Sequence, residues 1–101
     1  MIVRVQSVNF TADQKLIAFI QKKLDKLDQF HDRIIDGEVY LKVDNNHQKE
    51  NKITEIKINI PGIDLVVKKQ SRSFEHAADL SAEALKRQLK KYKEKYRAMA
   101  S

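Results

Sequence analysis

The last quarter of the chain, residues 73–97, has the apolar spacing of one long helix, and this segment constrains the fold most. At about 100° per residue, its apolar side chains fall on one side of a helix. They are Phe74, Ala78, Ala82, Leu85, Leu89, Tyr92 and Tyr96. We expect this side to dock on a core that the rest of the chain provides.

The polar side of the same segment is strongly basic. Between Lys86 and Arg97, seven basic residues stand against the single acid Glu94, so the segment carries +6, which equals the net charge of the whole 101-residue chain. The basic residues are Lys86, Arg87, Lys90, Lys91, Lys93, Lys95 and Arg97. A helix C-terminus attracts a few cations through its dipole, but the effect fades beyond the last turn. The excess therefore favours an anionic partner over a merely solvated face, and a pI near 9.6 favours nucleic acid ahead of an anionic membrane surface.

A strand and a helix are predicted for the first 29 residues. Residues 2–8 alternate between apolar and polar side chains, which is typical of a short strand. Thr11 precedes Gln14 by three positions, the spacing of a capping box, so a helix is predicted over residues 12–29. Its apolar face contains Leu16, Ile17, Ile20, Leu24 and Leu27. Its other side contains Lys15, Lys22, Lys23 and Lys26. Phe19 lies among these lysines, either as a flank of the core or as an exposed aromatic that could stack on a base.

Three further strands precede the basic helix. Residues 38–43 and 55–60 both alternate, with valine, leucine and isoleucine on one face and polar residues on the other. A wholly polar segment, residues 44–51, joins them as a hairpin loop. Pro61 and Gly62 form a tight turn before the last strand, residues 63–70, and Ser73 is a suitable N-cap for the final helix.

The predicted order is β-α-β-β-β-α, which indicates a single α+β domain over residues 1–101. A strand and helix that return to a second strand form a parallel pair through a right-handed crossover, and two hairpins then add antiparallel strands. We expect a four-stranded mixed sheet with both helices packed on one face and the other face wet. This makeup is like that of a double-stranded-RNA-binding domain. Helices lying side by side would bring Lys22, Lys23 and Lys26 close to the basic end of the last helix.

Catalytic, metal-binding and membrane-spanning patterns are absent from the sequence. There is no cysteine, and His31, His47 and His76 each lack a second histidine at ligand spacing. Asp79 and Glu83 are one turn apart, and we attribute them to the helix dipole and to pairing with Lys86 and Arg87. No apolar run approaches the roughly 20 residues of a membrane span. We therefore expect a cytoplasmic protein that is not an enzyme and uses no cofactor, metal or small-molecule substrate.

Two segments resemble a known family. Lys23–Ile34 (KLDKLDQFHDRI), together with Ala77–Asp79 and Leu85–Lys93 (LKRQLKKYK), resembles the bacterial hibernation promoting factor family, also called ribosome-associated inhibitor or ribosomal subunit interface proteins. The resemblance extends over nearly the whole chain. It implies a stationary-phase factor that binds the small ribosomal subunit and its RNA, in the channel for messenger and transfer RNA, and inhibits translation. It also implies the short form, which lacks a C-terminal dimerisation domain, and we expect a monomer off the ribosome.

The resemblance also implies which residues contact RNA. The matching positions are Lys23, Lys26, Arg87, Lys91, Lys93 and Lys95. The helical pattern adds Lys22, Lys86, Lys90 and Arg97 to them. One departure is that Ser73–His76 stands where the family usually has an Asp and an aromatic, which bears on the N-terminal contacts of that helix. Two other functions remain open at this point: a free-standing module for double-stranded RNA, and a regulatory domain that binds protein through the wet sheet face.

Overall fold

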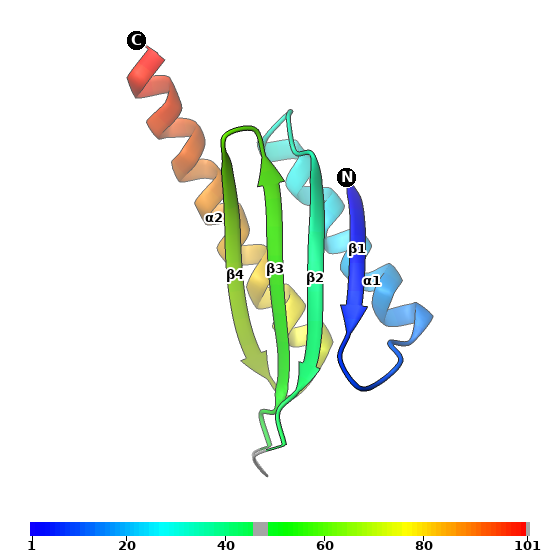
Figure 1. The fold of residues 1–101 in the computed structure, drawn as a ribbon. Helices are drawn as coiled ribbons and strands as arrows, with labels where there is room; N and C mark the ends of the chain where they lie inside the picture. Colours follow the sequence, from blue (N-terminus) through cyan, green and yellow to red (C-terminus); the bar gives the residue numbers. More distant parts are fainter. Residues whose placement is uncertain (46–48, 101) are drawn as a thin grey trace.

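The α+β architecture is the one that the sequence predicts. The computed structural model describes residues 1–45 and 49–100, with side chains described for residues 1–45 and 49–93. The elements are β1 (Ile2–Ser7), α1 (Gln14–Asp25), a 3-10 helix η1 (Lys26–Phe30), β2 (Asp36–Val43), β3 (Lys52–Ile60), β4 (Ile63–Ser71) and α2 (Phe74–Ala100). Figure 1 shows one sheet with both helices behind it. Residues 46–48 of the predicted polar loop, including His47, lie outside the described residues.

The four strands lie in the sheet in their order along the chain. β1 pairs with β2 in parallel, and β2–β3 and β3–β4 are antiparallel. The register aligns Val5 with Val39, Val39 with Ile56, and Ile56 with Val67. Because side chains alternate between the two faces of a strand, this apolar row crosses the whole sheet on one face. That face is the one that the helices cover, with α2 packed on β3 and β4.

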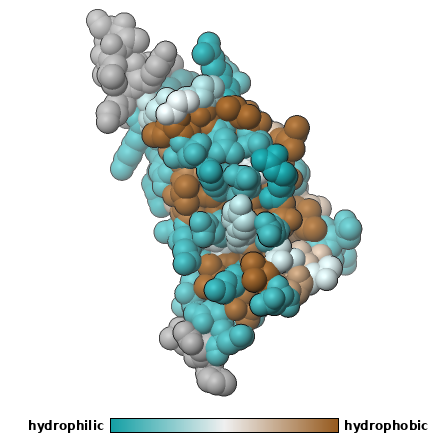
Figure 2. All heavy atoms as spheres, in the orientation of Figure 1, coloured by the Kyte–Doolittle hydropathy of each residue, from teal (hydrophilic) through white to brown (hydrophobic). Residues whose placement is uncertain are grey.

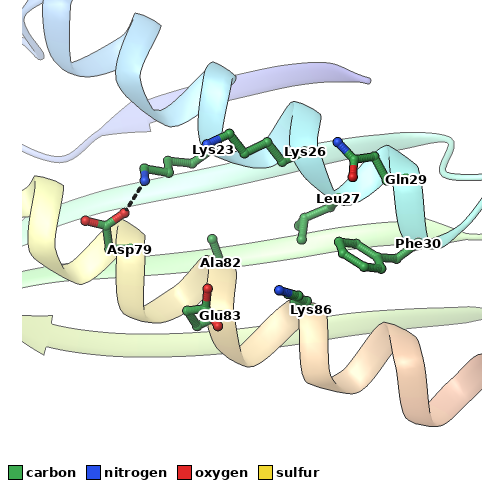
Figure 3. Close-up of a pocket in the computed structure, with 9 residues that line it drawn as sticks. All are labelled: Lys23, Lys26, Leu27, Gln29, Phe30, Asp79, Ala82, Glu83 and Lys86. Atoms are coloured by element: carbon green, nitrogen blue, oxygen red, sulfur yellow. Dashed lines mark ion pairs between the residues drawn. The ribbon is translucent and has the colours of Figure 1, made fainter.

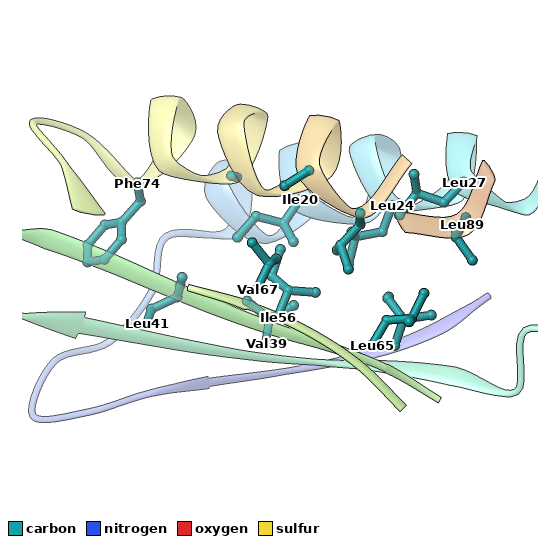
Figure 4. Close-up of a cluster of buried hydrophobic side chains, with 14 of the residues drawn as sticks. Ile20, Leu24, Leu27, Val39, Leu41, Ile56, Leu65, Val67, Phe74 and Leu89 are labelled. Atoms are coloured by element: carbon teal, nitrogen blue, oxygen red, sulfur yellow. The ribbon is translucent and has the colours of Figure 1, made fainter. Parts of the chain in front are cut away.

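The core lies between this face of the sheet and the two helices (Figure 4). Ile20 and Leu24 of α1 and Leu85 and Leu89 of α2 are completely buried there. Each such side chain contributes about 1.5–3 kcal/mol through burial, so the predicted apolar faces of both helices account for the docking. The hydroxyl of Thr54, on the inner face of β3, is also buried and makes no hydrogen bond among the described residues.

The first helix begins and ends differently from the prediction. Its N-cap is Asp13, whose carboxylate accepts a hydrogen bond of 3.0 Å from the amide of Lys15, so the capping box of Thr11 and Gln14 was wrong. An ionised carboxylate is a stronger acceptor for a backbone amide than a hydroxyl is. The helix also does not continue to Gln29 as an α-helix, because residues 26–30 tighten into η1.

The two local signals around β4 are confirmed. Pro61 and Gly62 form the turn before the strand, and Gly62 has a φ of +87°, a conformation that glycine adopts without steric cost. Ser73 caps α2, because its hydroxyl accepts from the amide of His76 at 3.1 Å. The turn before β4 and the start of α2 are therefore both set by features that are visible in the sequence.

Candidate nucleic-acid interface

α1, η1 and α2 lie side by side on the sheet, and a groove runs between them. Its volume is about 340 Å³. This interhelical groove has cationic side chains, an apolar floor and polar acceptors (Figure 3). It is lined by Lys23, Lys26, Leu27, Gln29, Phe30, Asp79, Ala82, Glu83 and Lys86. Lysines that the sequence placed on two separate helices therefore meet at one surface.

Phe30 holds two of the lysines in place. The ammonium groups of Lys86 and Lys90 each lie 5.3 Å from the centre of the Phe30 ring. Such cation–π contacts contribute about 0.5–1 kcal/mol at exposed sites. The ring belongs to η1 and the lysines to α2, so the contact joins the two elements and favours positions of the two ammonium groups close to the ring.

The sequence singled out a different aromatic residue, Phe19. Phe19 packs against the core and carries the ammonium of Lys23 at 5.3 Å from its ring centre, which favours the core-flank alternative. The signal for Phe30 was its position at the end of the first helical pattern, three residues after Leu27. Helical spacing could not show that the basic stripe of another helix would cover it.

Lys23 is neutralised in part by an acid of the other helix. Its ammonium lies 2.8 Å from a carboxylate oxygen of Asp79. The sequence-based expectation that Asp79 pairs with Lys86 or Arg87 was wrong, because the side-by-side packing of the helices brings Lys23 closer. Glu83 makes no ion pair with any described residue. The groove therefore contains one compensated lysine and one uncompensated carboxylate.

The remaining predicted residues divide between two sides of the helices. Lys22 lies on the far flank of α1, beside Ala18 and Gln21, and does not line the groove. Arg87, Lys91 and Lys93 are exposed on α2. The side chains of Lys95 and Arg97, and that of Tyr96 on the predicted apolar face, lie outside the described residues. We call the set Lys23, Lys26, Lys86, Arg87, Lys90, Lys91 and Lys93 the basic two-helix surface.

The outer face of the sheet has a different charge distribution. Arg4 of β1 bonds to Asp36 of β2 at 2.7 Å, and Lys57 of β3 lies within 4 Å of carboxylates on both neighbouring strands. Hydrogen bonds from Asn59 and from Arg4 lower the pKa of Asp36. In Figure 2 this face shows hydrophilic and hydrophobic side chains interspersed. Arg4, Asp36, Glu38, Lys57 and Asp64 thus form ion pairs across neighbouring strands, whereas Lys26, Lys86 and Lys90 of the basic two-helix surface form none with a described residue.

The described part of the chain contains neither a cluster of metal-ligating side chains nor a membrane-spanning helix. No three of its His, Cys, Asp or Glu side chains gather in a way that could hold a metal ion. Neither helix, over its described residues, combines the length and apolar character needed to cross a bilayer.

The fold and the site define a class: an α+β domain whose two helices cover one face of a four-stranded sheet and present a cationic surface suited to a polyanion. The chain belongs to the family described as sigma 54 modulation protein / S30EA ribosomal protein, whose family model matches residues 3–97.

Two ribosome hibernation factors are similar to this chain in sequence. It is 30% identical over 99 residues to a ribosome hibernation promoting factor from Pseudomonas putida, a match that covers 98% of this chain and 93% of that protein. It is 28% identical over 97 residues to a ribosome hibernation promotion factor from Deinococcus radiodurans, covering 94% of this chain and 50% of that protein. The chain thus spans about half the length of the latter relative. The family resemblance stated from the sequence is confirmed.

Solved structures share the fold. The N-terminal domain of Protein Y from Thermus thermophilus superposes with a TM-score of 0.80 at 22% identity, covering 91% of this chain and 99% of that one. A ribosomal subunit interface protein from Coxiella burnetii gives a TM-score of 0.82 at 22% identity, covering 92% and 98%. At this identity the likeness shows the fold.

Proposed function

We propose that this protein is a ribosome hibernation factor. In this proposal, residues 1–101 form one ribosome-binding domain that binds RNA of the small ribosomal subunit, in the messenger and transfer RNA channel, and inhibits translation. The family and the names of the relatives support a ribosome-associated, non-enzymatic role. The observation that carries the proposal is the basic two-helix surface, where Lys26, Lys86 and Lys90 converge without a compensating ion pair.

Such a surface would act by occupancy. RNA presents phosphates and ribose hydroxyls, and lysines on rigid helices can bind that pattern with little sequence dependence. The helices are held by the buried core, so the backbone that carries the cations needs little reordering when RNA binds. A protein bound in the channel would exclude messenger and transfer RNA sterically.

Binding of this kind is salt-dependent. If six phosphates are neutralised, counterion release predicts that log affinity falls with log salt concentration at a slope of about −4 to −5. An affinity for ribosomes that does not change with salt would contradict the mechanism.

The ion pairs on the outer sheet face argue against the alternative function, in which that face binds a partner protein. There the charged groups Arg4, Asp36, Glu38, Lys57 and Asp64 already pair within the sheet. A partner that docks on this face would have to replace those ion pairs. An anion on the basic two-helix surface would instead interact with lysines that form no ion pair with a described residue.

The deciding experiment is co-sedimentation with purified small and large ribosomal subunits. We expect binding to the small subunit, and its loss when Arg87, Lys91 and Lys93 are all changed to glutamate. A matched control changes Lys42, Lys49 and Lys68 to glutamate, which alters the net charge equally but lies outside the helices; this variant should still bind. Loss of binding in both variants, or in neither, would contradict the proposed surface. A gel shift with naked duplex RNA separates this function from that of a free-standing duplex-binding module. Such a module would bind the duplex as tightly as it binds ribosomes.

A further inference from the structure

Glu83 is an unusual group for a surface that binds phosphates. It lies on α2 between Asp79 and Lys86, and its carboxylate lines the interhelical groove (Figure 3). Asp79 is held by Lys23, but Glu83 makes no hydrogen bond or ion pair with any described residue. A free carboxylate repels phosphate and can only accept hydrogen bonds. Glu83 is exposed, and a ligand group within hydrogen-bond reach of its carboxylate is favoured when it carries N–H or O–H donors.

The floor of the groove points to a flat apolar group. Leu27, Phe30 and Ala82 line it, with Leu27 and Phe30 on η1 and Ala82 on α2 (Figure 3). Phosphates do not need an apolar floor, whereas an unpaired base in RNA is commonly held by contact of its ring with aromatic or apolar side chains.

The groove is also bounded at both ends. At one end the ion pair of Lys23 and Asp79 spans the two helices, and at the other Lys86 contacts Phe30. Its volume of about 340 Å³ is at the small end of the range for ligand pockets, about 300–1,000 Å³. This size suits a single nucleotide better than a stacked pair.

We propose that the interhelical groove binds one unpaired guanine of the RNA. Its ring lies on Leu27, Ala82 and Phe30, its N1–H and N2–H₂ groups donate to the carboxylate of Glu83, and the adjoining phosphates contact Lys26 and Lys86. Guanine fits this site because its Watson–Crick edge has two neighbouring donors that match the two oxygens of a carboxylate. Adenine, cytosine and uracil each place acceptors beside their donor on that edge, and the carboxylate repels these. The inference rests on the proposed function and adds base selectivity to it.

The test uses short single-stranded RNAs in which a run of uridines carries one central guanosine, adenosine, cytidine or inosine. Fluorescence anisotropy at constant salt should show that the guanosine oligomer binds about tenfold more tightly than all-uridine RNA, since a bidentate base contact typically discriminates at this level. Inosine lacks the 2-amino group and should fall between them. A 2′-deoxyguanosine oligomer should bind like the ribose form.

Glu83→Gln separates this role from general electrostatics. Removing a negative charge should leave the affinity for all-uridine RNA equal or higher, while the preference for guanosine falls below about threefold, because the amide presents its own N–H₂ to guanine donors. Glu75→Gln, an exposed acid in the first turn of α2, is the matched control and should keep the preference. Ala82→Leu, which fills the floor, should lower the affinity for the guanosine oligomer to that for uridine.

A wild-type protein without guanosine preference, a preference that survives Glu83→Gln, or a preference that depends on the 2′-hydroxyl would overturn the proposal. If ribosomes still bind in a manner that needs Arg87, Lys91 and Lys93, only the guanine site fails. If ribosomes do not bind at all, the proposed function fails as well.

Discussion

Lys23 of α1 and Asp79 of α2 form an ion pair of 2.8 Å that joins the two helices at one end of the interhelical groove. Both side chains are partly exposed, at 31% and 44%. A pair this accessible contributes about 0–1 kcal/mol to stability, so its main effect is on the charge that the surface presents. It holds one of the predicted RNA-binding lysines in a compensated state.

Replacing Asp79 should therefore strengthen RNA binding. In Asp79→Asn the ammonium of Lys23 becomes available to phosphate, and the slope of log affinity against log salt should become steeper by about 0.7–0.9, one additional phosphate contact. Salt titrations of ribosome binding measure this change, with Glu75→Gln as a control that removes an acid elsewhere on α2. Weaker binding of Asp79→Asn would show that the ion pair has a positioning role instead.

Lys90 and Lys22 should contribute differently to ribosome binding, although both are exposed lysines. The ammonium of Lys90 lies over the ring of Phe30, which lines the groove, whereas Lys22 lies on the far flank of α1. Lys90→Gln should lower the affinity for the small subunit and reduce the salt slope by about 0.7–0.9, one phosphate contact. Lys22→Gln should change neither quantity beyond the effect of one unit of net charge. Equal losses in the two variants would mean that only net charge matters.

The contact of Phe30 with Lys86 should be measurable as a coupling free energy. Phe30→Leu keeps an apolar side chain but removes the ring face, and Lys86→Met keeps the stem but removes the charge. A double-mutant cycle of urea unfolding should give a coupling of about 0.5–1 kcal/mol. The control cycle pairs Phe30→Leu with Lys91→Met, because Lys91 lies on the outer side of α2 and does not contact the ring. This cycle should show no coupling.

Thr54→Val should not destabilise the protein. The hydroxyl of Thr54 is buried on the inner face of β3 and has no hydrogen-bond partner among the described residues. Removing an unsatisfied buried polar group at nearly constant shape should be neutral or raise the free energy of unfolding by about 1 kcal/mol. Urea unfolding tests this, and a loss of stability would indicate that the hydroxyl is hydrogen-bonded in solution.

The outer sheet face should make stability depend on pH through Asp36. Hydrogen bonds from Asn59 and Arg4 lower its pKa in the folded protein. A lowered pKa means that the carboxylate stabilises the folded state above its ordinary pKa and loses this effect as the pH falls through the lowered value. The difference in unfolding free energy between wild type and Asp36→Asn should therefore be full at pH 6 and shrink steadily below pH 4. A difference that stays constant down to pH 2 would contradict the assignment.

Much of this fold was predictable from local patterns. Alternation over residues 38–43 and 55–60, the spacing of Leu85 and Leu89, and the Pro61–Gly62 turn each depend on short-range backbone geometry, which is the same wherever the element lies. The ends of the first helix were harder to predict. Both Thr11 and Asp13 are residue types that cap helices, and the change to a 3-10 helix after Asp25 depends on packing.

The sequence by itself determined the elements, their apolar faces and the concentration of positive charge on the last helix. The tertiary structure decided which charges meet: Asp79 pairs with Lys23 rather than with a residue of its own helix, Phe30 supports Lys86 and Lys90, and Lys22 faces away. The physical reason is that helical periodicity fixes the direction of a side chain only relative to its own axis. The neighbour in that direction is set by how two helices settle side by side on the sheet, and this depends on the packing of the whole core.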